Sequence, residues 1–282
     1  SFASRWAIEN DAAQAELGEY DRASLADAIT PPLNNPRTVG ALGGIVASRI
    51  AREYNIGGPS HTFSSGENSG LSALEAGMRA LQRGEISAAL VGAVDLGGDL
   101  RNLRSIDALR PYSRKGSSVP FDTSADGAFP GEGAVAMVLK RKDDALRDGN
   151  RIITIVKGVG RATLTTPGDN SASIDAYCRA MQAAWNESGL NMSDMGLLEA
   201  NGSGNPEEDS LEAAALTATL PVKEISAENL FQNNDQLCAL TSSKSFIGHT
   251  GCAAGLFSLA RAAVSLYQRI LPRYPLLKSP LP

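Results

Sequence analysis

Four residues whose side chains could do chemistry stand in three Gly- and Ser-rich segments, each between a short apolar run and a helical pattern. Glu67 lies in GPSHTFSSGENSGLSAL, Asn201 in EANGSGNPEEDSLEAAAL, and Lys244 and His249 in SSKSFIGHTGCAAG. Carboxylates and imidazoles can transfer protons, and amides and ammonium groups can stabilise an oxygen that gains negative charge. The three segments are therefore candidate catalytic loops.

The turn that carries Glu67 is predicted to present its side chain at the N-terminus of a helix. Unpaired N–H groups and the positive end of the helix dipole favour negative charge there, and enzymes use this geometry to lower the pKa of a cysteine. Each loop also has an ordinary structural explanation. An acidic residue stabilises the first turn of a helix, an Asn-Gly pair is commonly a turn, and a single His beside apolar residues is usually structural.

The elements that must position these residues alternate between helix and strand. Apolar residues at helical spacing predict helices over residues 71–83, over 173–188 and, largely buried, from about 253. Short β-branched runs predict a buried strand over residues 86–96 and further strands from 133 and from 151. A short polar helix is expected in DDALRDGN, and the Pro-rich tail is expected to be extended. This alternation indicates an α/β protein.

Composition excludes several classes of function. The 282 residues are 43% hydrophobic and 20% charged, with a net charge of -5 and no basic stripe, which argues against nucleic-acid binding. Three dispersed cysteines without a CxxC pair argue for a reducing compartment, and two histidines exclude a His-rich metal centre. Neither a transmembrane run nor a signal-peptide pattern is present, so a cytoplasmic protein is expected. The GALGG run at 40–44 lacks the GxGxxG spacing of nucleotide-binding proteins.

Taken together, the three loops resemble those of the β-ketoacyl synthases of the thiolase superfamily, in both order and spacing. That family carries GPSxTVDTACSSSLxAL, then EAHGTGTxxGDxxEAxAL, then KSNIGHTxxAAG. Two further stretches of this sequence, ALQRGEISAALVGAVDL and VPFDTSADGAFPGEGAVAMVLKRKDDALRDGNRI, are also similar to the family. The resemblance covers residues 36–275. It implies a thiolase-like α/β fold in which two similar halves, 1–149 and 150–282, form a five-layered αβαβα arrangement. The family's terminal Gly-rich GFGGTNAH-like segment is not in the sequence.

The resemblance implies a degenerate catalytic triad. The family's nucleophilic cysteine falls on Glu67, and its first histidine falls on Asn201, with the following threonine on Ser203. The second histidine is retained as His249 and the lysine as Lys244. Condensation needs a thiolate that accepts an acyl chain, and a carboxylate would give a reactive mixed anhydride instead. Asn cannot replace a titrating imidazole, so this site is not expected to condense acyl groups.

Some members of this family are chain-length factors, which lack the cysteine and pair with an active ketosynthase. The glutamate in a GENSG-like turn looks most like the second ketosynthase-type domain of bacterial polyunsaturated fatty acid synthases. The resemblance therefore implies an active ketosynthase as partner, in a hetero- or pseudo-dimer, and acyl carrier protein domains that deliver substrate. The protein is expected to have no cofactor of its own, because the acyl chain would arrive on the phosphopantetheine arm of the carrier.

Two alternatives remain open from the sequence. Some ketosynthase-like loading domains carry Gln at the cysteine position and decarboxylate malonyl-carrier protein, but the charge of Glu67 would repel a malonate carboxylate. The chain could also be a scaffold that has no part in the acyl tunnel. In every case a Glu67–Lys244 ion pair is predicted to fill the former pocket and hold the loops together.

Overall fold

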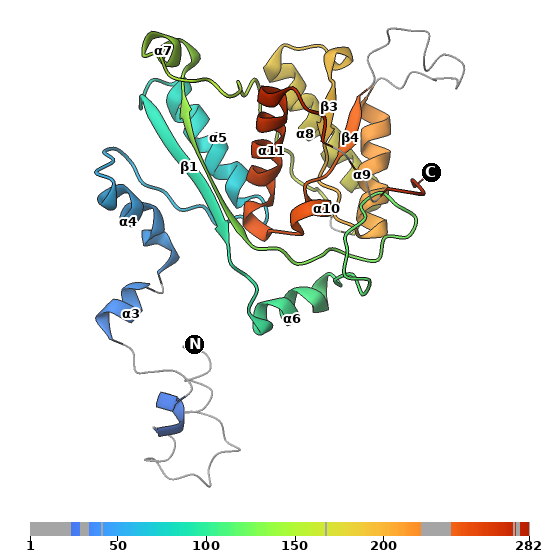
Figure 1. The fold of residues 1–282 in the computed structure, drawn as a ribbon, viewed down its shortest axis with the longest axis horizontal. Helices are drawn as coiled ribbons and strands as arrows, with labels where there is room; N and C mark the ends of the chain where they lie inside the picture. Colours follow the sequence, from blue (N-terminus) through green and yellow to red (C-terminus); the bar gives the residue numbers. More distant parts are fainter. Residues whose placement is uncertain are drawn as a thin grey trace. The chain divides into compact units, whose positions relative to one another are not determined.

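The computed structural model describes residues 24–28, 34–40, 42–166, 168–220, 238–272, 274 and 277–281. The chain divides into two compact units, Ser1–Thr62 and Phe63–Pro282, and each is considered by itself (Figure 1). The first unit contains α3 (Asn35–Gly40), the 3-10 turn η2 (Gly43–Ile45) and α4 (Val46–Glu53). All four candidate site residues lie in the second unit. The expected halves, 1–149 and 150–282, stay a prediction.

The second unit begins with a helix on a two-stranded antiparallel sheet. Helix α5 (Ser69–Gln82) is followed by β1 (Ala88–Asp95), which pairs with β2 (Gly133–Lys140) over their whole lengths. Successive side chains of a strand point to opposite faces, so one face of this sheet meets α5. Val91 on that face joins Leu74, Met78 and Leu256 in the hydrophobic core. The helix, both strands and the glycine turn after α5 confirm the predictions for this region.

Helices α6 (Leu100–Leu109) and α7 (Lys142–Arg147) flank the strands, and α7 is the short polar helix expected in DDALRDGN. The strand predicted from Arg151 is wrong, because residues 151–164 form neither helix nor strand. These residues pair with no other described segment. Val156 and Val159 nevertheless pack against the core, and the Val159 N–H donates to the Glu187 carboxylate on α8.

The rest of the second unit is built around a short parallel sheet. Its elements are α8 (Asn170–Ser188), η3 (Met192–Asp194), β3 (Leu197–Glu199), α9 (Pro206–Thr219), β4 (Ala239–Thr241), α10 (Lys244–Ile247), η4 (Gly251–Ala253) and α11 (Ala254–Gln268). Strands β3 and β4 pair in parallel. Helix α8 ends at Gly189, whose positive φ of 65° suits the expected glycine C-cap. The combination of helices with parallel and antiparallel strands confirms a mixed α/β fold.

Two glycines let α5 and α11 lie side by side, as Figure 1 shows. A Cβ at Gly70 would lie 3.0 Å from the Cys252 carbonyl oxygen and 3.0 Å from Leu256 Cγ. A Cβ at Gly255 would lie 2.6 Å from Leu71 Cγ. Because both contacts leave no room for a side chain, the start of α5 and the start of α11 are held against each other.

The chain's last described residues form no helix, bend at 278–279, and attach to the loop at 120–124. The buried carboxylate of Asp122 accepts hydrogen bonds from the backbone N–H groups of Ser124, Lys278 and Ser279. The hydroxyl of Tyr274 donates to the Pro120 carbonyl oxygen at 2.6 Å. These bonds hold the segment against residues 120–122.

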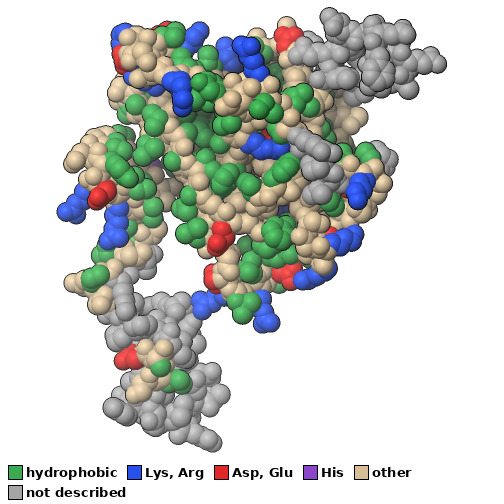
Figure 2. Space-filling model, viewed as in Figure 1, with side chains coloured by type: hydrophobic (Ala, Val, Ile, Leu, Met, Phe, Trp, Pro, Cys, Tyr) green, Lys and Arg blue, Asp and Glu red, His purple; other side chains and the backbone are tan. Residues whose placement is uncertain are grey.

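The surface of the second unit differs from the expectation of a buried strand at 86–96 and a largely buried helix from about 253. On β1 and β2, Leu90 and Val138 face away from α5 and are 46% and 72% exposed. Leu266 near the end of α11 is 63% exposed. Figure 2 shows such apolar side chains on one face, with Lys and Arg side chains scattered among them. The run of apolar residues misleads here because only one face of each element has a described neighbour.

Candidate functional site

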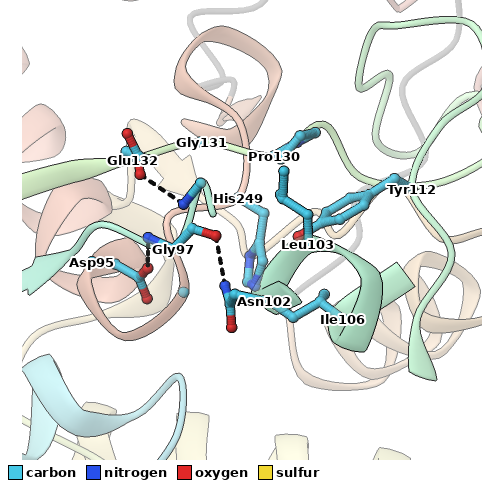
Figure 3. Close-up of a pocket in the computed structure, with 12 residues that line it drawn as sticks. Asp95, Gly97, Asn102, Leu103, Ile106, Tyr112, Pro130, Gly131, Glu132 and His249 are labelled. Atoms are coloured by element: carbon cyan, nitrogen blue, oxygen red, sulfur yellow. Dashed lines mark hydrogen bonds between the residues drawn. The ribbon is translucent and has the colours of Figure 1, made fainter. Parts of the chain in front are cut away.

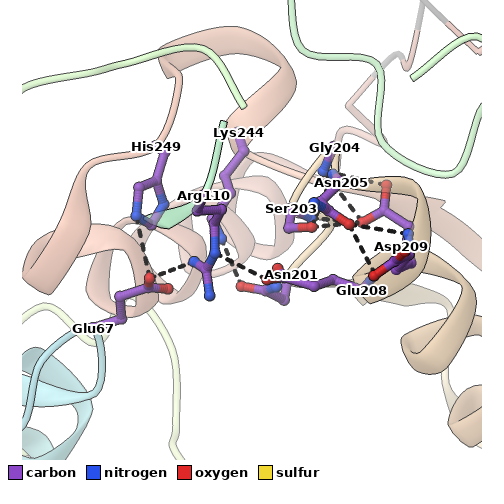
Figure 4. Close-up of polar contacts among 11 residues, drawn as sticks. Glu67, Arg110, Asn201, Ser203, Gly204, Asn205, Glu208, Asp209, Lys244 and His249 are labelled. Atoms are coloured by element: carbon purple, nitrogen blue, oxygen red, sulfur yellow. Dashed lines mark hydrogen bonds and ion pairs between the residues drawn. The ribbon is translucent and has the colours of Figure 1, made fainter. Parts of the chain in front are cut away.

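The structure brings all four predicted site residues together (Figure 4). Glu67 immediately precedes Asn68, the N-cap of α5, and Asn201 lies two residues beyond the end of β3. Lys244 begins α10 and His249 follows it, next to the Gly248 C-cap. The His249 Nε2 atom lies 3.4 Å from Glu67 Oε1, and Lys244 Nζ donates to Asn201 Oδ1 at 2.7 Å. The three loops thus form one polar site.

The predicted Glu67–Lys244 ion pair is wrong. Glu67 Oε1 is instead bound by Arg110 Nη1 at 2.5 Å, with His249 as the second neighbour. Lys244 turns to the amide oxygen of Asn201, which lies closer than any carboxylate. The former cysteine position is therefore filled by an arginine–glutamate pair.

Arg110 is a site residue that sequence reasoning missed. It caps the C-terminal end of α6, and its Nε atom lies 2.9 Å from the Glu208 Oε1 atom of α9, so it joins the Glu67 turn to α9. Its side chain is 34% exposed, whereas those of Lys244 and His249 lie deeper. No motif marks Arg110, because it follows a helix of mixed polar and apolar residues in a stretch without a recognisable pattern, and the contact spans 43 residues along the chain.

The charges around Glu67 keep its carboxylate ionised. Burial by itself would raise the pKa of Glu67, but the hydrogen bond and charge of His249, followed by the charges of Arg110 and Lys244, lower the pKa to about 2. Lys244 is only 4% exposed, and this burial lowers the pKa of its ammonium group. The charge of Glu67 is the largest effect that opposes this lowering. The two residues therefore interact through space without direct contact.

The loop after Asn201 is held by two buried carboxylates of α9. Glu212 accepts the N–H groups of Asn201 and Gly202, both at 2.8 Å. Asp209 accepts the N–H groups of Ser203 at 2.7 Å and Gly204 at 3.2 Å. Burial raises the pKa of both carboxyl groups, and the backbone hydrogen bonds oppose that rise. These bonds fix where Asn201 stands relative to Lys244.

Ser203, at the expected threonine position, is a part of this loop scaffold. It is 2% exposed, and its hydroxyl lies 3.2 Å from Asp209 Oδ1 and accepts the Asn205 N–H at 3.0 Å. Asn205 in turn caps α9, and Pro206 occupies the first turn of that helix, where the lack of an N–H is tolerated. Ser203 therefore holds the loop in place and does not join the contacts around Glu67.

A cavity of about 330 Å³ adjoins the site on the side of α6 (Figure 3). His249 lines it together with apolar side chains from α6 and the following loops, namely Leu103, Ile106, Tyr112 and Pro130. Asp95, Asn102 and Glu132 also border it, and each is hydrogen-bonded to the backbone at Gly97 or Gly98. Since these polar groups already have partners, the cavity offers mainly apolar surface beside the imidazole of His249.

The described residues include no group of three or more His, Cys, Asp or Glu side chains placed to hold a metal ion. The thiols of Cys178, Cys238 and Cys252 are free. None of the described helices is both long and apolar enough to cross a membrane.

Comparison with protein families places two matches along the chain. The family described as "Beta-ketoacyl synthase, N-terminal domain" matches residues 12–145, and "Beta-ketoacyl synthase, C-terminal domain" matches residues 154–277. A mycocerosic acid synthase-like polyketide synthase of Mycobacterium tuberculosis is 34% identical over 233 residues, which cover 80% of this chain and 10% of that protein. The highly reducing polyketide synthase ntnH of a Nectria species is 35% identical over 230 residues, which cover 81% of this chain and 9% of that protein. The chain thus spans about a tenth of these curated relatives.

Solved structures that resemble this chain are also ketosynthases. The ketosynthase from module 6 of the bacillaene synthase of Bacillus subtilis superposes with a TM-score of 0.76 at 28% identity, over 88% of this chain and 44% of that one. The oxazolomycin ketosynthase domain OzmH KS7 of Streptomyces albus has a TM-score of 0.77 at 25% identity, over 94% of this chain and 44% of that one. The likeness to ketosynthase domains confirms the predicted thiolase-like fold, and the chain spans less than half of each of these domains.

Proposed function

The chain belongs to the β-ketoacyl synthase family, and on that premise we propose that it is a condensation-inactive, chain-length-factor-like ketosynthase domain. It pairs with an active ketosynthase and bounds the acyl tunnel of a polyketide or polyunsaturated fatty acid synthase. Acyl carrier protein domains supply its acyl chains on their phosphopantetheine arms. The relatives named as polyketide synthases support this setting.

The observation that carries the proposal is the state of the former cysteine position. Glu67 is ionised and bound by Arg110 and His249, so its carboxylate is a weak nucleophile that already has partners. Acyl transfer to it would form a mixed anhydride, which is more reactive than the thioester it came from. Asn201 has no titrating group, and its amide oxygen already accepts the Lys244 ammonium. No described residue at this site supplies the missing thiolate.

The cavity beside His249 supports a role in the acyl tunnel. Its apolar lining from α6 suits a hydrocarbon chain, because binding removes apolar surface from water. Leu103 and Ile106 project into it from successive turns of α6. A side chain that is larger at either position reduces the space for a chain without touching the ion pairs of Glu67.

Replacement of Leu103 by Trp tests this role in the full chain, produced together with its synthase partners. We expect Leu103→Trp to shorten the products, because the indole fills the cavity. Leu109→Trp is the matched control, since Leu109 ends the same helix and is 86% exposed. The measurement is the product-length distribution by mass spectrometry. Unchanged lengths in a folded Leu103→Trp protein would contradict the tunnel role and favour a scaffold.

A further inference from the structure

The basic side chains of the site are not matched one to one by carboxylates. Arg110 binds both Glu67 and Glu208, and His249 also approaches the same Glu67 oxygen. Lys244 carries three N–H donors, and its one side-chain hydrogen bond goes to the neutral amide of Asn201. Within the described residues no carboxylate lies in ion-pair contact with the Lys244 ammonium.

The shortage of carboxylate partners is costly because Lys244 and His249 are buried. Lys244 is 4% exposed and His249 8%, so neither is well solvated by bulk water. A buried charge is costly unless an opposite charge or several hydrogen bonds compensate it. Glu67 supplies the opposite charge nearby, with one carboxylate oxygen held by Arg110 and His249. Such a cluster of guanidinium, ammonium and imidazole suits a carboxylate because charged donors give the stronger hydrogen bonds.

We propose that Arg110 and His249 form a carboxylate-binding site, that the buried ammonium of Lys244 adds its charge through space, and that the side chain of Glu67 is the built-in ligand of this site. This deepens the proposed function, because an occupied carboxylate site excludes malonyl-type substrates at the former cysteine position. The apolar cavity lined by His249, which Glu67 does not border, stays open to an uncharged acyl chain. The protein would therefore accept a growing chain while it rejects the extender unit.

The substitution Glu67→Ala shows how large a free carboxylate could take the place of the Glu67 side chain. Glu67→Ala removes four heavy atoms, namely Cγ, Cδ and the two carboxylate oxygens. Acetate consists of the same four heavy atoms, so it fits the vacated space and restores the lost charge. Formate is smaller and fits as well.

Thermal unfolding of the full chain tests the site with acetate as the probe. We expect Glu67→Ala to have a lower Tm than wild type in sodium chloride. In sodium acetate of equal ionic strength its Tm should rise, by roughly 5 °C once acetate reaches about a hundred times its Kd. Wild type should not respond to acetate beyond chloride, because Glu67 occupies the site. Formate should act like acetate.

Two variants control this test. Glu85→Ala breaks the exposed Arg83–Glu85 pair at the other end of α5, and should show no acetate-specific shift. Glu67→Gln removes the charge but keeps the volume, so it should lose stability without gaining an acetate response. An equal acetate shift in Glu85→Ala or Glu67→Gln would overturn the proposal.

Failure of the variant to fold is also informative. If Glu67→Ala is unfolded in chloride, refolding in acetate but not in chloride supports the site, and no refolding in either salt contradicts it. A folded Glu67→Ala protein without an acetate shift also contradicts it. That result leaves the tunnel role intact, since the tunnel is tested separately by Leu103→Trp and its product lengths.

Discussion

Removal of the Asp209 carboxylate should cost a large part of the stability of the second unit. Asp209 is fully buried and accepts N–H groups from Phe121 at 2.9 Å, Ser203 at 2.7 Å and Gly204 at 3.2 Å. Phe121 also has a φ of 60°, which non-glycine residues rarely adopt, so its conformation depends on such contacts. Asp209→Ala leaves these three buried donors without their acceptor.

The magnitude follows from the number of donors. A buried donor without a partner costs about 1–3 kcal/mol, so three would cost roughly 3–9 kcal/mol in a rigid structure. The variant no longer desolvates a carboxylate, and water can enter the vacated space, both of which offset part of this cost. We expect a loss of about 4 kcal/mol for Asp209→Ala and about half of that for Asp209→Asn, which keeps one acceptor oxygen.

Urea unfolding of the full chain measures these differences in the free energy of unfolding. Glu207→Ala is the matched control, because Glu207 lies in the same first turn of α9 and is exposed. It should change stability by less than about 0.5 kcal/mol. A loss below about 1 kcal/mol for Asp209→Ala would refute the argument, since it would mean that the three N–H groups find other partners at little cost.

Three further outcomes follow from the site. Glu67→Cys alone should not condense acyl groups, because Asn201 still lacks an imidazole, and efficient chain elongation by the purified variant would contradict this. Malonyl-carrier protein incubated with the wild-type chain should not be converted to acetyl-carrier protein, as measured by mass spectrometry. Formation of acetyl-carrier protein at a useful rate would favour a decarboxylase. The pKa of Glu67 falls from 4.5 to about 2 on folding, so its ionised form stabilises the fold above pH 4.5 and that contribution is lost as the pH falls towards 2. The stability difference between wild type and Glu67→Gln should shrink over that range, and a pH-independent difference in chemical unfolding would be inconsistent with the ion pairs.

Local sequence patterns predicted most elements because the residues of each element themselves favour its backbone conformation and its ends. The helices at 69–82 and 170–188 end where glycine allows the chain to turn, and β1 and β2 follow β-branched runs. The run from Arg151 has the same composition as a strand, yet a strand also needs a partner strand, and residues 151–164 pair with no other described segment. The composition of a run does not show whether a partner strand pairs with it.

The candidate site was predictable in its members but not in its contacts. The family resemblance identified Glu67, Asn201, Lys244 and His249, and the structure places them together. It did not identify Arg110, which reaches Glu67 from a helix end without a motif. Ion-pair partners depend on where long side chains meet in space, so charge types and spacing along the chain could not settle which cation binds Glu67.

The close contact of α5 with α11 has a consequence for the order of folding. It joins Gly70 to Leu256, so the first part of the site is packed against one of the last helices of the chain. Contacts between segments so distant in sequence form slowly, because a long loop must close first. During synthesis, Leu74 and Met78 stay without their Leu256 neighbour until α11 has left the ribosome. The polar site is therefore completed only after α11 has been synthesised.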